Sequence, residues 1–140
     1  MADSSLLQVN NLSVEFSTPL GTVKAVTEVS WLVSPGQILA IVGESGSGKS
    51  VTALSILQLI PTPPGRIVSG QVLFGKTDLL RLSEDQIRKF RGRKISMVFQ
   101  EPMTSLNPVL SIGRQITEQM KLHLGLDTAG ARERAIELLT

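Results

Sequence analysis

The chain has 140 residues, of which 41% are hydrophobic, a formal net charge of +2 and no cysteine. This composition is that of a globular protein of one ordinary domain, and it excludes disulfides, cysteine-based zinc sites and thiol catalysis. No apolar stretch approaches the ~20 residues needed to span a bilayer, and the near-zero net charge gives no general attraction to nucleic acid. The first ten residues lack the basic and apolar regions of a signal peptide, and the absence of cysteine agrees with a cytosolic location.

Two β-rich segments open the chain. Gln8–Phe16 ends in alternating apolar residues, and Val23–Val33 is rich in β-branched residues. Thr18–Gly21 between them contains Pro19 and Gly21, which favour a turn. Two such segments joined by a short turn predict an antiparallel pair of strands.

A strand, a glycine-rich loop and a helix are expected next. Gln37–Val42 is a short, mostly apolar run, typical of a buried parallel strand. Gly43–Ser50 reads G-E-S-G-S-G-K-S, the G-x-x-x-x-G-K-[ST] pattern of a phosphate-binding P-loop. Lys49–Ile60 is predicted to be helical and to stop at Pro61 and the two prolines that follow.

Each part of the loop pattern has a chemical role. Glycines let the backbone turn tightly and approach a ligand, and the helix start adds partial positive charge. Lys49 can reach the terminal phosphates, and the hydroxyl of Ser50 can ligate Mg²⁺. The predicted nucleotide-binding residues of this segment are Gly43, Ser45, Gly46, Ser47, Gly48, Lys49, Ser50 and Val51. The alternative for these residues is a flexible Gly/Ser-rich turn that happens to precede a lysine.

The middle of the chain predicts a strand and a short helix. Gly65–Phe74 has the character of a strand, and Ser83–Gln86 has the S-x-x-Q spacing of a capping box, which would open a helix to about Phe90. A basic cluster follows within seven residues, formed by Arg88, Lys89, Arg91, Arg93 and Lys94. It is interpreted as a solvated face, with contact to a polyanion as the alternative.

The last third predicts one more strand and two helices. Lys94–Phe99 is a strand-like run that ends immediately before Gln100. Ser111–Leu124 has apolar residues at i+4 spacing, and a further helix begins near Ala129. That helix has no C-cap glycine and no stop signal before Thr140, so we expect the chain to continue in a longer protein.

Three motifs together carry a resemblance to a known family. They are V-E-F at 14–16, V-G-E-S-G-S-G-K-S at 42–50 and M-V-F-Q-E-P-M-T-S-L-N-P at 97–108. With them the chain resembles the ATP-binding subunits of ABC transporters, closest to the dipeptide/oligopeptide (peptide/nickel) permease branch. The resemblance implies an α/β fold over residues 1–140: an incomplete P-loop NTPase core with an N-terminal antiparallel β subdomain. It places the P-loop at 43–50, the Q-loop at 100–108 and the start of a helical subdomain at about 109–140.

The resemblance also assigns roles to single residues. Gln100 corresponds to the Q-loop glutamine, which can touch Mg²⁺ and the attacking water, so Lys49 and Gln100 are the candidate catalytic residues. Ser50 and Gln100 are the candidate Mg²⁺ ligands. Phe16 matches the aromatic residue that stacks on adenine, although a phenylalanine that closes an alternating strand can equally pack in the core. The expected cofactors are ATP and Mg²⁺.

The implied function is that of the motor subunit of an ABC importer at the cytoplasmic face of the membrane, energising uptake of peptides or related small solutes. Its expected partners are permease subunits that contact the Q-loop region, a second ATP-binding subunit in a head-to-tail dimer, and indirectly an extracytoplasmic solute-binding protein. The family's L-S-G-G-Q-type signature, the acidic strand with its catalytic glutamate, and the switch histidine do not occur in this sequence. A truncated, non-catalytic nucleotide-binding fragment is therefore one alternative, and another P-loop kinase or GTPase is a second.

Overall fold

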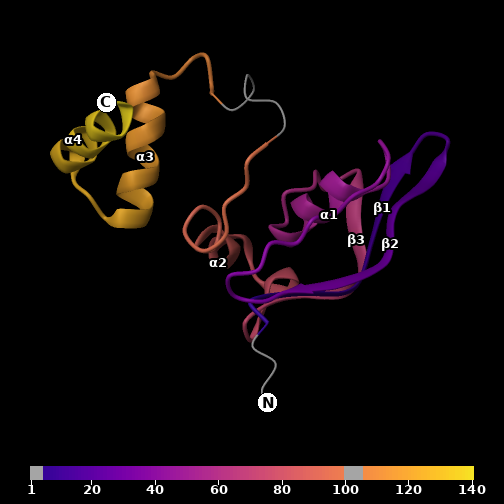
Figure 1. Ribbon diagram of the computed structural model, residues 1–140. Helices are drawn as coiled ribbons and strands as arrows, with labels where there is room; N and C mark the ends of the chain where they lie inside the picture. The colour runs from indigo at the N-terminus through magenta and orange to yellow at the C-terminus, as the bar shows by residue number, and fades with distance from the viewer. Residues whose placement is uncertain (1–4, 100–105) are drawn as a thin grey trace. The chain divides into compact units, whose positions relative to one another are not determined.

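The computed structural model describes residues 5–99 and 106–140, in two compact units of residues 1–87 and 88–140 (Figure 1). The strands and helices of the first unit are β1 (Leu7–Thr18), β2 (Gly21–Val33), α1 (Lys49–Ile56), β3 (Gly65–Phe74), β4 (Thr77–Asp78) and the 3₁₀ turn η1 (Leu79–Arg81). Helix α2 (Glu84–Arg88) lies at the boundary of the two units, and the second unit contains α3 (Ile112–Leu124) and α4 (Thr128–Leu139). Each unit is described by itself.

The first unit is built on an antiparallel sheet in the order β2-β1-β3-β4 (Figure 1). The pairing of Thr18 with Gly21 leaves Pro19 and Leu20 as the two turn residues of the β1–β2 hairpin. This confirms the predicted antiparallel pair, and it confirms Gly65–Phe74 as a strand, which pairs with the other side of β1.

The core of the first unit lies between the sheet and α1. Buried side chains from the sheet and from the α1 segment share it: Val9, Leu12, Val14, Val26, Val72, Ile56, Leu57 and Ile60. Burial of each aliphatic side chain of this size stabilises a fold by about 1.5–3 kcal/mol. The alternation of apolar and polar residues in β1 thus gives the sheet one apolar face, which packs against the helix.

Two predicted strands are absent from the structure. Gln37–Val42 and residues 96–99 have no strand assignment, and only Ile95 forms a single parallel bridge, with Arg91. The side chains of Ile38 and Val42 are 95% and 88% exposed, so the expectation of a buried parallel strand was wrong for this chain. A strand forms only when a neighbour pairs with its N–H and C=O groups, and no described segment pairs with these two runs.

The second unit contains a helical hairpin. Ser111 accepts a hydrogen bond from Arg114 N–H and caps α3, Gly125 ends α3 with φ 66°, and Asp127 caps α4. Met120 packs between the helices with Ala131 and Ala135 of α4. The predicted helices from Ser111 and near Ala129 are confirmed. Among the described residues, no helix is long and apolar enough to cross a membrane.

Close backbone packing at Gly70 gives a test of the sheet. Gly70 has φ 109°, and a Cβ built there would lie 2.6 Å from the Cα of Leu12 on β1. We expect Gly70→Ala to lower the unfolding free energy by about 2 kcal/mol or more, because it adds both backbone strain and overlap with a neighbouring strand. Urea unfolding measures this. In Gly113→Ala the new methyl group meets nothing within 4 Å on α3, so that control should be neutral or stabilising. Equal stability of the two variants would contradict the described packing.

Candidate phosphate-binding site

The junction between the loop and α1 is fixed by two glycines in the left-handed region. Gly46 has φ 82° and Gly48, the N-cap residue of α1, has φ 87°. A Cβ on Gly48 would collide with the carbonyl oxygen of Ala25 and lie 3.3 Å from a methyl group of Val26. The absence of a side chain at Gly48 therefore lets the start of α1 rest directly on the backbone of β2.

The ammonium group of Lys49 turns back onto the loop. Its Nζ donates to the carbonyl oxygens of Gly43 and Glu44, at 2.7 and 2.6 Å, and to the hydroxyl of Ser47 at 3.2 Å. The same Ser47 hydroxyl lies 2.6 Å from where a Cβ of Gly43 would be. Gly43 thus leaves the space in which Ser47 and Lys49 meet, and the loop closes around a positive charge.

The first turn of α1 presents its backbone donors at the same place. Thr52 N–H donates back to Gly48 O at 2.8 Å, so the N–H groups of Lys49, Ser50 and Val51 precede the first intrahelical donor. No side chain caps this end of the helix. Unpaired N–H groups and the positive end of the helix dipole, next to an ammonium group, form an anion site.

Ser50 and Ser45 are exposed next to this anion site. The structure records no hydrogen bond from the Ser50 side chain to any described residue. Its hydroxyl lone pairs are therefore available to a cation that accompanies a phosphate. The residues present fit a Mg²⁺–phosphate group. The described part of the chain has no cluster of three or more His, Cys, Asp or Glu that could hold a metal. Mg²⁺ would therefore be held by Ser50 together with the phosphate, and not by a group of carboxylates.

Phe16 lies half-buried at the end of β1, opposite Val23 of β2 and Gly65 of β3. An edge of its ring is against Gly65, 2.8 Å from where a Cβ would be. Gly48 packs on Val26 of β2, and Val23 lies three residues before Val26, a distance of about 10 Å along the strand. Phe16 therefore pairs with the strand on which the loop rests. Its role, as an adenine platform or as core packing, stays a prediction.

Gln100 lies outside the described residues, and its predicted catalytic and metal-binding roles stay predictions. The structure does describe the chain again from Leu106, where Gln115 of α3 binds the backbone. Gln115 accepts from Asn107 N–H at 2.8 Å and donates to Asn107 O and Leu110 O, each at 2.9 Å. No sequence signal points to Gln115, because a single glutamine on a polar helix face has no distinctive spacing.

Helix α1 is shorter than predicted. It ends at Ile56, not at Ile60, because Gln58 has φ 52° and breaks the helical repeat. The carboxamide of Gln58 turns toward η1, where it donates to Leu79 O and Leu82 O. Sequence reasoning missed Gln58, since only glycine and asparagine signal a left-handed helix end.

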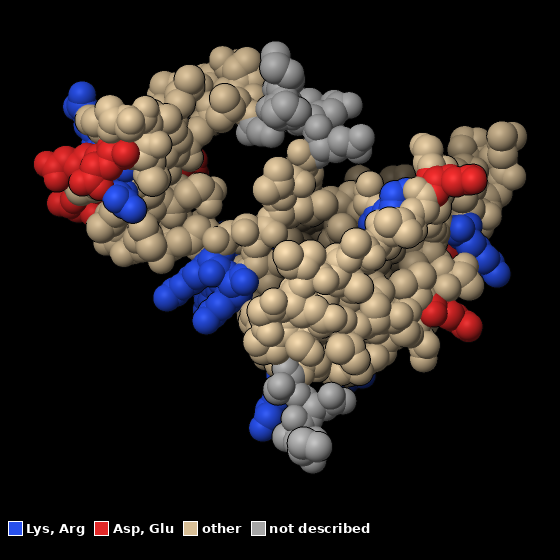
Figure 2. Space-filling view, in the orientation of Figure 1, with Lys and Arg blue, Asp and Glu red and all other residues tan. Residues whose placement is uncertain are grey.

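One half of the predicted capping box on α2 is present: Ser83 N–H donates to the Gln86 side chain at 2.9 Å, while Gln86 N–H donates to the backbone oxygen of Ser83. Helix α2 ends at Arg88 and not near Phe90. Lys and Arg side chains gather in blue groups on the surface in Figure 2. Within the basic cluster, Arg88, Lys89, Arg93 and Lys94 are exposed. This exposure agrees with a solvated face, and it leaves the polyanion alternative untested.

Comparison with known proteins gives the family. The sequence profile described as "ABC transporter" matches residues 26–139. Two solved structures are similar: the dimeric MJ0796, titled a bacterial ABC transporter cassette, with a TM-score of 0.77 at 24% identity, and a post-hydrolysis state of MJ0796 bound to ADP and Pi, with 0.74 at 22%. Each likeness covers 94% of this chain and 54% of the solved one, and it supports the fold.

Curated relatives of similar sequence are ATP-binding proteins of transporters. The chain is 48% identical over 134 residues to the oligopeptide transport ATP-binding protein OppD of Bacillus subtilis, which covers 96% of this chain and 37% of that protein. It is 52% identical to a putative peptide import ATP-binding protein of Brucella abortus and to the peptidoglycan transport ATP-binding protein YejF of Agrobacterium fabrum, over 40% and 24% of their lengths.

The chain therefore belongs to the ABC transporter family and has a partial ATP-binding cassette fold. It spans well under half the length of the curated relatives described above. The alternative of a different P-loop kinase or GTPase finds no support in these comparisons.

The loop–strand contact gives a second test. We expect Gly48→Ala to destabilise the chain more than Gly46→Ala does. Both residues have positive φ, but only at Gly48 does the new methyl group collide with a strand backbone, while Gly46 faces open space. Chemical unfolding of the two variants measures the difference, expected to be at least about 1 kcal/mol. An equal loss in both would show that the glycines matter for φ alone.

Proposed function

We propose that this chain is the nucleotide-binding part of the ATP-binding subunit of an ABC importer that takes up peptides or related small solutes. One observation carries the proposal: Lys49 and the unpaired first turn of α1 converge on one loop, in a member of the ABC transporter family. The names of the oligopeptide and peptide transport relatives support peptides as the class of solute.

The residues have defined roles in this proposal. Phosphate oxygens accept hydrogen bonds from the N–H groups of the loop and of the first turn of α1, and they take the place of the Ser47 hydroxyl beside Lys49. Ser50, together with Gln100, holds Mg²⁺, which when bound neutralises charge on the phosphates. Lys49 binds the terminal phosphates, and Phe16 stacks on adenine.

The domain organisation follows the same proposal. Residues 1–140 form part of a nucleotide-binding domain, with a Q-loop at 100–108 that contacts permease subunits and a helical subdomain that begins at about 109. A second ATP-binding subunit completes the site in a head-to-tail dimer at the cytoplasmic face of the membrane. A solute-binding protein acts indirectly, through the permease.

Hydrolysis needs groups that this sequence does not supply. The chain holds phosphate and metal, but it has no L-S-G-G-Q-type signature and no strand that ends in an Asp–Glu pair to orient and deprotonate the attacking water. We therefore propose that the 140-residue chain binds ATP without turning it over at the family's rate, which is the non-catalytic alternative applied to this chain alone.

Nucleotide binding is tested by removing the ammonium group. We expect Lys49→Ala to weaken MgATP binding in calorimetry by at least about tenfold, because a desolvated charge-assisted contact to phosphate is lost. Lys76→Ala, which removes an exposed lysine in the β3–β4 turn, is the matched control and should bind like the original chain. Unchanged affinity of Lys49→Ala, or no binding by the original chain, would overturn the proposed function.

Turnover is tested separately by phosphate release. The original chain should release phosphate from MgATP no faster than Lys49→Ala does, since neither has the base for the attacking water. A robust rate in the original chain that Lys49→Ala abolishes would contradict the non-catalytic proposal and would leave the binding proposal intact.

A further inference from the structure

Helix α1 is held at its start by β2 and at its end by the η1 turn. At its start, Gly48 rests on Ala25 and Val26 of β2. At its end, Gln58 reaches η1, which follows β3 and β4. Helix α1 contacts β1 and β2, whereas η1 contacts β3, so the bond from Gln58 links the end of α1 to the part of the sheet beside β3.

The contact at the end of α1 is directional. Gln58 Nε2 donates to Leu79 O at 2.6 Å and to Leu82 O at 3.3 Å, so one amide group bonds both ends of the η1 turn. Both bonds are partly buried. Gln58 holds this position at φ 52°, a conformation that costs a residue with a side chain some free energy. The bonds to the two carbonyl oxygens offset that cost.

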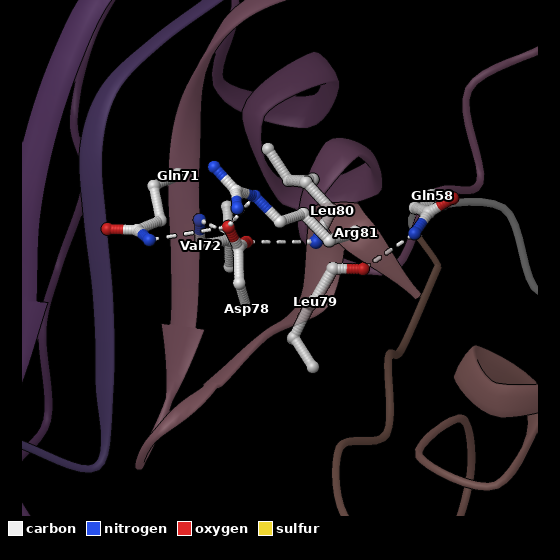
Figure 3. Close-up of polar contacts among 7 residues, drawn as sticks. All are labelled: Gln58, Gln71, Val72, Asp78, Leu79, Leu80 and Arg81. Carbon is white, nitrogen blue, oxygen red and sulfur yellow. Dashed lines mark hydrogen bonds and ion pairs between the residues drawn. The ribbon is translucent and has the colours of Figure 1, made fainter. Parts of the chain in front are cut away.

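The η1 turn is itself fixed to β3 through Asp78 (Figure 3). One carboxylate oxygen accepts from Leu80 N–H at 3.2 Å and Val72 N–H at 3.4 Å, and the other accepts from Gln71 Nε2 and pairs with Arg81 Nε, each at 3.3 Å. The Asp78 side chain is only 13% exposed. Through Asp78, the η1 turn that Gln58 contacts is tied to β3 by several polar contacts.

Apolar packing alone does not set the rotation of α1. Ile56 and Leu57 are buried, but contact between apolar side chains is non-directional and allows a helix to turn about its axis. Hydrogen bonds fix direction as well as distance. A small rotation at the end of α1 re-aims the N–H groups of its first turn, and misplacement of binding groups by about 1 Å is costly at such sites.

We propose that Gln58 is a positioning residue for the phosphate site: by tying the end of α1 to η1, it aims the first-turn N–H groups and Lys49 at the phosphates. The inference rests on the proposed nucleotide site and goes beyond it, since Gln58 lies at the other end of the helix and touches no ligand. Its acceptors are two carbonyl oxygens, so the essential property is a donor at the end of an unbranched side chain.

Three variants of Gln58 separate the donor from the backbone and from packing. Gln58→Met keeps the length and neutrality and removes the donor. Gln58→Lys keeps a donor for the two carbonyl oxygens at similar backbone cost. Gln58→Gly relieves the positive φ and removes the side chain. The matched control is Gln86→Met, because the Gln86 carboxamide accepts only from its own helix start at Ser83 N–H among the contacts recorded for it.

Affinity for MgATP is measured by calorimetry in the 140-residue chain, at a temperature where circular dichroism shows each variant folded. We expect Gln58→Met and Gln58→Gly to bind roughly 3–10-fold more weakly, Gln58→Lys to bind within about twofold of the original chain, and Gln86→Met to be unchanged. Measurements at two salt concentrations remove any direct effect of the new lysine charge, which is screened beyond about 10 Å at 0.1 M salt.

The outcomes are distinct. If Gln58 only capped α1, Gln58→Met would lower the melting temperature, but the folded variant would bind MgATP with unchanged affinity. That result would overturn the inference. If Gln58→Met does not fold, the comparison of Gln58→Lys with Gln58→Gly decides, because glycine cannot unfold the chain through strain at this φ. Equal affinities there would also overturn it. Failure of the original chain to bind MgATP would instead refute the proposed function.

Discussion

The structure of the first unit depends on the direct contact between Gly48 and the backbone of β2. At this point the loop becomes a helix, the backbone has φ 87°, and no side chain separates the helix start from Ala25. The contact fixes the first turn of α1 against the sheet, so that its N–H groups, Lys49 and the Ser47 hydroxyl share one small volume. Burial of Leu12, Val14 and Val26 beneath α1 keeps that arrangement in place.

The sheet and the loop thus serve one chemical purpose. An anion site built from backbone donors needs a rigid backbone, because each N–H contributes only if it points at the ligand. Antiparallel pairing on both sides of β1 provides a stiff support, and α1 packs on it in contact with β1 and β2. Family membership and the loop geometry are the two observations behind the proposal that phosphates bind at the start of α1.

Features with a local physical cause could be predicted from the sequence. The hairpin follows from Pro19 and Gly21, the α3 start from Ser111, and the loop from its glycines and Lys49. Features that depend on distant partners could not. Gln37–Val42 has the composition of a buried strand, yet it is exposed, because pairing requires a neighbour that composition does not reveal. The helix end at Gln58 was missed for the same reason, since its stabilising acceptors belong to η1.

The most direct test of the central claim is to compare the affinities of ATP, ADP and AMP, each with Mg²⁺, by calorimetry on the purified chain. If the site is a cradle for the terminal phosphates at Lys49 and the first turn of α1, ATP and ADP bind and AMP binds at least about tenfold more weakly, since it lacks the phosphates that Lys49 contacts. Equal affinity for all three nucleotides would contradict the account, because the base and ribose would then supply the binding and the loop would not.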